Sequence, residues 1–308
     1  MSKVTIIGAG AMGSVYAGLM RDAGHEVHGV TLWPDHAAAV TENGLRVHGA
    51  SGDRTVRLAS MTTTTDCIGR SDLVIIATKA FDVEAAALSA RSLIGPRTVV
   101  QTIQNGLGSA DRVASVLGAD RLAVGVVGGF GASVPTPGTA HHNGMEMVRF
   151  GSYSTLPRAD LAASAEVWTS AGFQVRLFDD IGQMVWEKLI MNVAFSGTCV
   201  LTELTIGGVI ADQNAWQVAS ACSREAVAVA QAADVTLDVG DPIEHVRTLG
   251  GKIPHARPSM LIDASLRRRG EVDAINGAIS ARGKDLGVPT PVNDTVVALI
   301  KAREAAYL

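Results

Sequence analysis

The chain has 308 residues, of which 47% are hydrophobic and 18% charged, and its formal net charge is −4. This length allows two domains with sizeable cores, and the only dense basic cluster, at residues 267–269, is too small for a nucleic-acid-binding face. The three cysteines, Cys67, Cys199 and Cys222, are too scattered for a disulfide scaffold or a metal site, so we expect no metal and a reducing, cytoplasmic compartment.

Two kinds of targeting segment are not expected. A strand-like run begins at Lys3, which leaves no room for a signal peptide. The longest apolar stretch, residues 181–201, is interrupted by Glu187, Lys188 and Asn192, so we expect no membrane span. The composition therefore favours a cytoplasmic enzyme without a membrane partner.

The first thirty residues predict a dinucleotide-binding unit. A β-branched run at 4–7 precedes the glycine pattern Gly8-x-Gly10-x-x-Gly13, a helical pattern follows, and a second strand is expected at 27–31. Gly8 would allow the tight turn, Gly10 the close approach of a pyrophosphate, and Gly13 the packing of helix on strand. The helix N-terminus would then present free N–H groups to the phosphates.

The adenosine end of this unit carries neither of the usual signals. NAD-binding proteins place an acidic residue near the end of the second strand, but here Thr31, Leu32 and Trp33 precede Asp35. NADP-binding proteins usually carry an arginine there, which is also missing, and His28 and His36 are the nearest candidate cations. The missing acid favours NADP(H), and NAD(H) stays open.

Further buried-strand runs at 73–77, 98–103 and 122–127 alternate with helical segments at 83–93 and 110–117. This alternation predicts a doubly wound, mainly parallel α/β sheet. Ligands of such sheets lie beyond the carboxyl ends of the strands, so Lys79 and Asn105 are expected on the cofactor side. Residues 132–151 are expected to form antiparallel strands at the sheet edge, with His141 and His142 as ordinary polar residues there.

From residue 181 onward the pattern is helical, and no strand is expected. Helices are predicted at 183–200, 216–233, 260–286 with a break at its glycines, and 293–306. We therefore expect a Rossmann domain over residues 1–180 and an all-α, substrate-binding and dimerisation domain over residues 181–308. The Ala-rich helical domain favours a homodimer.

Two stretches of the helical domain hold polar residues that core packing does not require. Lys188 and Asn192 are four residues apart on one helix face, with Ser196 one turn further. Ser259 lies beside Pro258 at a helix start, where it could also serve as a cap. Lys188 has a second interpretation too, as a surface lysine that lays its stem on apolar neighbours.

With these motifs in view, the chain resembles the ketopantoate reductase (2-dehydropantoate 2-reductase) family along essentially its whole length. The resemblance rests on GAGAMGSVYAGLM at 8–20, TKAFD at 78–82, QNGLG at 104–108, WEKLIMN at 186–192 and SMLIDASLRRRGEVDAING at 259–277. It implies an NADPH-binding Rossmann domain joined to an all-helical domain, with the active site in the cleft between them. It also implies the reduction of 2-dehydropantoate, a 2-oxo acid, to (R)-pantoate in pantothenate and coenzyme A biosynthesis.

The resemblance also implies roles for single residues. Lys188 matches the catalytic lysine and Glu271 the active-site glutamate, and Asn105, Asn192, Ser196 and Ser259 fall at substrate-binding positions. The implied cofactor-binding residues are Gly8, Ala9, Gly10, Ala11, Met12, Gly13, Lys79, Asn105 and Glu271. A lysine ammonium can stabilise the oxyanion left by hydride transfer and supply its proton, so Lys188 is the expected general acid.

The chain departs from the family pattern at three places. Ser196 and Ala256 stand where some members carry asparagine, and Trp33 lies where an arginine is usual. The first two leave open a related D-2-hydroxyacid dehydrogenase that reduces another branched or aromatic 2-oxo acid, and the third leaves NADH open. A non-enzymatic nucleotide sensor is a further alternative, although such a protein need not retain both Lys188 and Glu271.

Overall fold

A computed structural model describes residues 1–129, 131–144 and 147–308. Residues 145 and 146, within the range predicted as antiparallel strands, lie outside the described residues. The chain forms two compact units. The α/β unit contains Met1–Gln104 and Ser109–Ile181, and the helical unit contains Asn105–Gly108 and Gly182–Leu308.

The α/β unit is built on an eight-stranded sheet with the order β12-β11-β8-β7-β6-β1-β2-β5. Its strands are β1 Lys3–Ile7, β2 Glu26–Val30, β5 Ser60–Thr62, β6 Leu73–Ile76, β7 Val99–Thr102, β8 Leu122–Val127, β11 Met147–Ser152 and β12 Gln174–Leu177. All neighbouring strands pair in parallel except β11 and β8, which are antiparallel. The predicted fold class, a mainly parallel α/β sheet followed by an all-α region, is confirmed.

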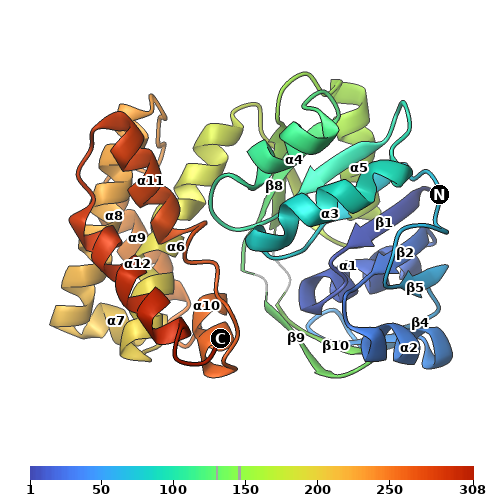
Figure 1. Cartoon of the computed structure of the whole chain (residues 1–308), viewed down its shortest axis with the longest axis horizontal. Helices are drawn as coiled ribbons and strands as arrows, with labels where there is room; N and C mark the ends of the chain where they lie inside the picture. The colour runs from blue at the N-terminus through green and yellow to red at the C-terminus, as the bar shows by residue number, and fades with distance from the viewer. Residues whose placement is uncertain (130, 145–146) are drawn as a thin grey trace. The chain divides into compact units, whose positions relative to one another are not determined.

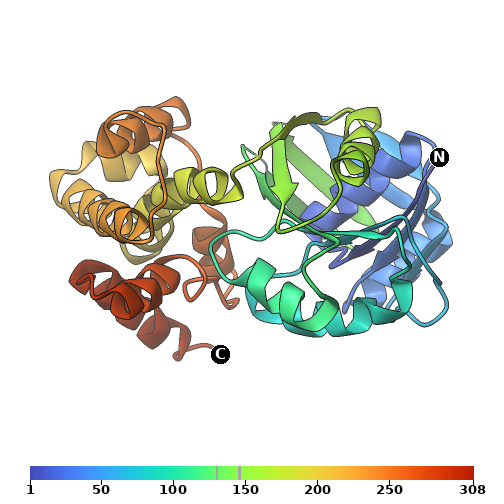
Figure 2. The same cartoon turned by 90° about the horizontal axis from the view of Figure 1, so that it is seen from above.

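Helices cover both faces of this sheet (Figure 2). They are α1 Ala11–Asp22, α2 Pro34–Asn43, α3 Val83–Ala90, α4 Ser109–Leu117 and α5 Arg158–Ser170, with 3₁₀ turns η1 Ala80–Asp82 and η2 Arg91–Leu93. Because side chains alternate along a strand, Ile6 and Ile75 enter the core shared with α1 and α5. Their neighbours Ile7 and Ile76 enter the core beneath α3 and α4. Burial on both faces explains the continuous apolar runs of these strands.

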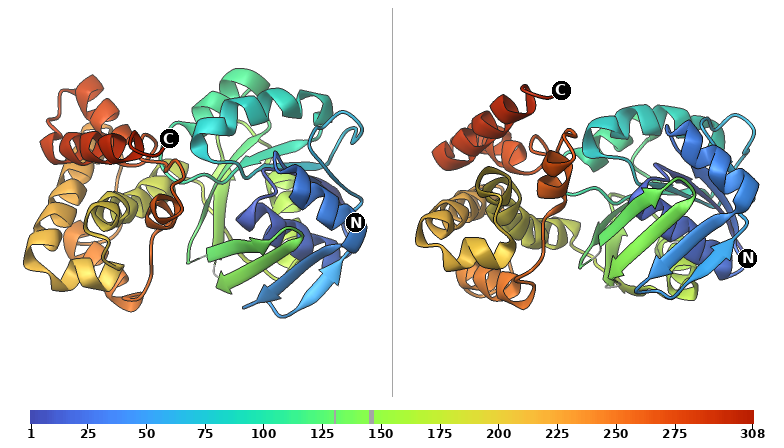
Figure 3. Two further views of the ribbon diagram at one scale, coloured as in Figure 1. Left: turned by 60° about the horizontal axis from the view of Figure 1, so that its bottom comes forward. Right: turned by 90° about the horizontal axis from the view of Figure 1, so that it is seen from below.

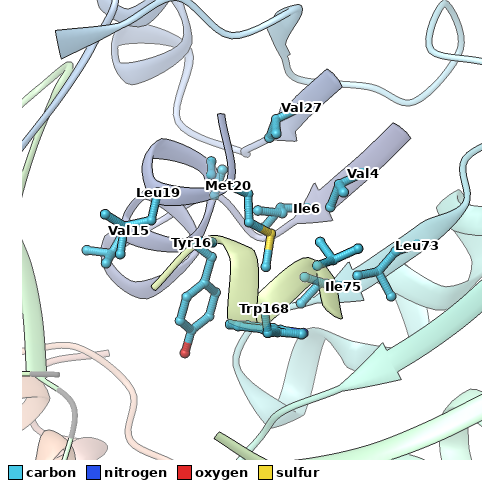
Figure 4. Close-up of a cluster of buried hydrophobic side chains, with 14 of the residues drawn as sticks. Val4, Ile6, Val15, Tyr16, Leu19, Met20, Val27, Leu73, Ile75 and Trp168 are labelled. Carbon is cyan, nitrogen blue, oxygen red and sulfur yellow. The ribbon is translucent and has the colours of Figure 1, made fainter. Parts of the chain in front are cut away.

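An aromatic cluster lies at the centre of the first of these cores (Figure 4). Tyr16 of α1 meets Trp168 of α5 edge to face, with ring centroids 4.9 Å apart. The Trp168 indole Nε1 donates to Gln101 Oε1 at 2.8 Å, which satisfies the one polar atom of the buried indole.

A second sheet, of four strands, was not predicted. It has the order β4-β3-β10-β9, from β3 Leu45–Gly49, β4 Arg54–Val56, β9 Gly131–Thr136 and β10 Thr139–Gly144. It lies beside α1 (Figure 3), where Gly18 lets the helix approach Val47 of β3. The prediction that residues 132–151 form an edge of the main sheet is therefore wrong for β9 and β10. It is also wrong for β11, which lies inside the sheet because β12 pairs with it.

The helical unit contains seven helices among its described residues (Figure 1). They are α6 Ile181–Thr202, α7 Ile206–Ala211, α8 Gln213–Ala232, α9 Pro242–Lys252, α10 Ser259–Ser265, α11 Asn276–Leu286 and α12 Pro291–Glu304. Asp212 and Asp241 cap α8 and α9 by accepting backbone N–H groups at 2.8–3.0 Å. The predicted break within 260–286 is confirmed as the segment between α10 and α11.

By length and composition alone, α6 could cross a membrane, but 67% of its apolar window is buried inside the protein. All eight residues from 193 to 200 are buried, so this part of the helix is enclosed by the rest of the helical core. A helix that is apolar all round is typical of the middle of a core. This burial indicates that α6 is a core helix of the helical unit.

Candidate functional site

The glycine segment between β1 and α1 has a shape that only glycine permits at two positions. Gly8 has a φ of +96°, and a Cβ there would lie 2.5 Å from the backbone nitrogen of Thr78. A Cβ at Gly13 would overlap the carbonyl oxygen of Gly8. The N–H groups of Gly8 and Ala9 both donate to the carbonyl of Val30, at 2.9 and 2.8 Å, which ties the segment to the end of β2.

Gly10 differs, because nothing lies within 4 Å of the Cβ position of this residue. The first bond of α1 runs from Ser14 N to Gly10 O at 2.9 Å. The N–H groups of residues 11–13 precede that bond and have no carbonyl in the helix to pair with. The first turn also contains no acidic residue. Open space beside unpaired, dipole-aligned N–H groups fits the pyrophosphate of a dinucleotide.

Two buried polar atoms without a partner among the described residues lie next to this segment. They are Thr78 Oγ1 and Gln104 Oε1. The Gln104 amide Nε2 donates to the carbonyls of Ile76 and Thr78, at 2.7 and 3.1 Å, so both orphaned atoms belong to the carboxyl ends of β6 and β7. Buried polar atoms of this kind call for a ligand or water. Lys79, half-buried, follows directly after Thr78.

The two histidines near the expected adenosine end make hydrogen bonds to other groups of the α/β unit. His28 makes hydrogen bonds to Ser60 Oγ at 2.8 Å and Glu26 Oε1 at 3.0 Å. His36 is fully buried, and burial lowers the pKa of its imidazole, which keeps it neutral. Both imidazoles are therefore already engaged by other groups, which makes each a poor partner for a 2′-phosphate. Leu32, 86% exposed, is the first exposed side chain after β2, since Thr31 is buried.

In the helical unit, the predicted catalytic lysine is held by an amide. The Lys188 Nζ of α6 donates to Asn105 Oδ1 at 2.8 Å. Both side chains are half-buried. Since Oδ1 accepts from the ammonium, the Asn105 Nδ2 is a donor that can point to a ligand. Lys188 is therefore not a surface lysine extended into water.

Asn105 reaches this position because residues 105–108 pack against a turn of the helical unit at Ala274. Gly106 has a φ of +85°, and a Cβ there would overlap the carbonyl oxygen of Ala274. Leu107 N donates to the same carbonyl at 2.9 Å, and the Leu107 side chain packs on the helical core. The turn begins at Glu271, whose carbonyl accepts from Ala274 N at 3.0 Å. Glu271 itself is buried, 6% exposed.

The remaining predicted residues differ in accessibility. Asn192 is half-buried on α6, and its amide makes no hydrogen bond to the described residues, so it is available to a ligand. Ser196 lies one turn deeper in the core and is only 5% exposed. Ser259 is exposed as the first residue of α10, where Pro258 occupies the cap position and no side-chain cap bond forms. The capping alternative for Ser259 is therefore wrong.

The structure thus brings Lys188, Asn105 and the Glu271 turn into one part of the helical unit. Sequence reasoning named Asn105 but missed Gly106, although a glycine directly after a polar residue at a strand end is a signal for a positive φ. It also missed Gln104, whose side chain looks like an ordinary loop amide in the sequence.

The chain is similar to two family models that together span most of its length. Residues 4–155 match "Ketopantoate reductase PanE/ApbA", and residues 180–304 match "Ketopantoate reductase PanE/ApbA C terminal". It is also 29% identical over 303 residues to the 2-dehydropantoate 2-reductase of Streptococcus pyogenes serotype M3, with 98% of each chain covered.

Two solved structures have the same fold over 99% of both chains. One is a PanE/ApbA family ketopantoate reductase from Ralstonia eutropha JMP134, with a TM-score of 0.91 and 30% identity. The other is the ternary structure of D-mandelate dehydrogenase with NADH and anilino(oxo)acetate, with a TM-score of 0.91 and 26% identity.

We predict that Gly10→Val weakens binding of the nicotinamide cofactor by at least about tenfold, because its branched side chain fills the space expected for the pyrophosphate. The fold should be unaffected, since that space is open in the protein itself. Fluorescence titration with NADH and NADPH, together with the thermal midpoint of the free protein, measures both effects. Gly251→Val is the control, because Gly251 also has nothing within 4 Å of its Cβ position. Equal affinities in wild type and Gly10→Val would refute the assignment.

We predict that Gly106→Ala lowers kcat by about tenfold or more, because the new Cβ displaces the segment that brings Asn105 to Lys188. Gly118→Ala is the matched control. Gly118 has a nearly identical φ of +86° but open space around its Cβ position, so it suffers the same backbone strain without the collision. Steady-state kinetics compare the two variants. A similar loss of kcat in both variants would show that backbone strain, and not the contact of Gly106 with the Ala274 carbonyl oxygen, causes the effect.

Proposed function

This chain belongs to the ketopantoate reductase family, and we propose that it reduces 2-dehydropantoate to (R)-pantoate with NADPH, in pantothenate and coenzyme A biosynthesis. The family and its curated relatives are oxidoreductases that act on a CH–OH group with a pyridine nucleotide. The observation that carries the proposal is the 2.8 Å hydrogen bond from Lys188 Nζ to Asn105 Oδ1. It holds an ammonium donor in a defined direction, as a ketone reduction requires.

The reduced cofactor, when bound, supplies a hydride to the 2-oxo carbon of the substrate. The C=O π bond breaks as the C–H bond forms, and the carbonyl oxygen gains negative charge. Lys188 stabilises this oxyanion and gives it one proton, which leaves a neutral amine that takes up a proton from water. Asn105 orients the ammonium through its Oδ1 and donates to the substrate through its Nδ2.

Four other residues complete the proposed substrate site. Asn192, which has an available amide four residues from Lys188, binds the substrate carboxylate or hydroxyl group. Ser259, exposed at the start of α10, supplies a hydroxyl donor. Glu271 offsets the charge of the ammonium and accepts from a substrate hydroxyl. We propose that Ser196, which is deeply buried, shapes the floor of the site.

A second candidate function is the reduction of another branched or aromatic 2-oxo acid. The similarity to a D-mandelate dehydrogenase over 99% of the chain favours it. Ser196 and Ala256, which replace amides that some relatives carry, remove polar groups that would recognise the pantoate hydroxyl. The chemistry at Lys188 is the same for both candidates, so only the substrate pocket distinguishes them.

The cofactor preference rests on the residues beyond β2. A 2′-phosphate needs a cation or several donors, and residues 31–41 contain no lysine or arginine. His28 and His36 are engaged elsewhere. We therefore expect only a weak preference between NADPH and NADH. We also propose that the protein is cytoplasmic and forms a homodimer. Sedimentation velocity of the purified protein tests the oligomeric state.

We predict that Lys188→Ala retains cofactor binding but loses at least about 100-fold in kcat, the usual scale for a positioned acid. The assay uses 2-dehydropantoate, 2-oxoisovalerate and phenylglyoxylate, each with NADPH and with NADH. The highest kcat/KM should be with 2-dehydropantoate. Lys252→Ala, which removes an exposed lysine of the same unit, should behave as wild type. A near-normal kcat in Lys188→Ala excludes the lysine from the mechanism, and a preference for phenylglyoxylate selects the second candidate.

We predict that Leu32→Arg raises the NADPH-to-NADH ratio of kcat/KM by about tenfold, because it adds the missing cation at an exposed position beyond β2. The gain should appear in the KM for NADPH and leave kcat unchanged. Leu299→Arg, on the 52% exposed Leu299 of α12, controls for the added charge. A ratio that does not move would place the adenosine ribose away from Leu32.

A further inference from the structure

The β9–β10 turn and the glycine segment are joined by a chain of three hydrogen bonds through His36, a buried histidine of α2. Gly138 N donates to His36 Nδ1 at 3.0 Å. The other ring nitrogen, Nε2, lies 3.0 Å from Ser14 Oγ, and Ser14 Oγ donates to the carbonyl of Ala9 at 3.3 Å. Ala9 lies between the first two glycines of the dinucleotide-binding pattern.

The donor in each of these three hydrogen bonds follows from the first bond, in which Gly138 N donates to His36. A backbone N–H can only donate, so Nδ1 of His36 must carry a lone pair. In a neutral imidazole the proton is then on Nε2, which must donate to Ser14 Oγ. The Ser14 hydroxyl then donates its own proton to the carbonyl oxygen of Ala9. His36 is fully buried, and burial lowers its pKa, so the neutral state that this order requires is the stable one.

The surroundings hold the imidazole in place. The Trp33 ring stacks on it, with centroids 5.4 Å apart and an interplanar angle of 20°. Gly138 has a φ of +81°, and its Cβ position lies 3.1 Å from the Ala39 side chain of α2. Glycine at 138 therefore favours the close approach to α2 in which the β9–β10 turn donates to His36, since a side chain there would be strained by this φ and crowded against Ala39.

We propose that His36 is a positioning residue for the cofactor, which acts through Ser14 to hold the Ala9 peptide and the first turn of α1 where the phosphates bind. The inference requires only pyridine-nucleotide binding from the proposed function, and it is independent of which 2-oxo acid is reduced. Trp33 connects the same chain to the loop beyond β2, where the adenosine ribose is expected. One buried side chain thus links the two ends of the expected cofactor-binding surface.

Two substitutions of His36 each keep one of its two hydrogen bonds and remove the other. In His36→Asn, the amide oxygen falls near Nδ1 and can still accept from Gly138, but the side chain is too short for Ser14. In His36→Gln, the amide group falls near Nε2 and can still donate to Ser14, but the bond to Gly138 is lost. A purely structural role would be sensitive to both losses, whereas positioning of Ala9 depends on the Ser14 side.

The experiment is fluorescence titration of NADH and NADPH into the full chain, with thermal midpoints of the free proteins and steady-state kcat. We expect His36→Asn to raise the Kd for both nucleotides by about tenfold, the scale of one lost buried hydrogen bond, with kcat at saturation unchanged. His36→Gln should bind within about threefold of wild type. An equal loss of affinity in the two variants would overturn the proposal.

Ser14→Ala keeps the test decisive if the His36 variants do not fold. It should raise the Kd as His36→Asn does, whereas Ser164→Ala should not. Ser164 is also a buried helical serine of the α/β unit, and it donates to Leu161 O at 2.7 Å away from the glycine segment. Equal affinities in Ser14→Ala and wild type reject the inference while the proposed function stands. Wild-type protein that binds neither nucleotide rejects both.

Discussion

The proposed chemistry depends on one contact, the seating of Gly106 against the carbonyl oxygen of Ala274. Only a residue without Cβ and with a positive φ can lie there. This contact brings Asn105 to Lys188, and it also joins the segment to the turn that begins at Glu271. The chain therefore contributes to the helical unit twice, first with residues 105–108 and then from Gly182 onward.

The same steric rule operates at the glycine segment of the α/β unit. Gly8 and Gly13 allow backbone to meet backbone, whereas Gly10 leaves space that the protein itself does not fill. Gly8 and Gly13 therefore maintain the fold, whereas Gly10 is the glycine that we propose leaves room for the cofactor. This difference parallels the separate roles that the motif predicts for the three glycines, and the surrounding atoms supply its steric basis.

Hydrogen bonds to backbone groups hold the glycine segment and its neighbouring side chains in place. Val30 accepts from Gly8 and Ala9, and the chain through His36 and Ser14 ends on the Ala9 carbonyl. A rigid, pre-oriented segment loses little entropy when phosphates bind, which is the usual source of affinity in such sites. His36, which in the sequence was a candidate cation, instead serves as a neutral connector.

Much of the fold was determined by local sequence. The apolar strands, the glycine turn, the helical register of Lys188 and Asn192, and the break before α11 all follow from periodicity and backbone sterics within short windows. Tertiary structure alone decided the second sheet, in which β3 pairs with β10 about ninety residues away. It also decided the burial of His36, whose donor is 102 residues distant, and the place of residues 105–108 in the helical unit. These features depend on contacts between backbone groups that are far apart in the sequence. A pattern of neighbouring residues does not specify which of those groups come into contact.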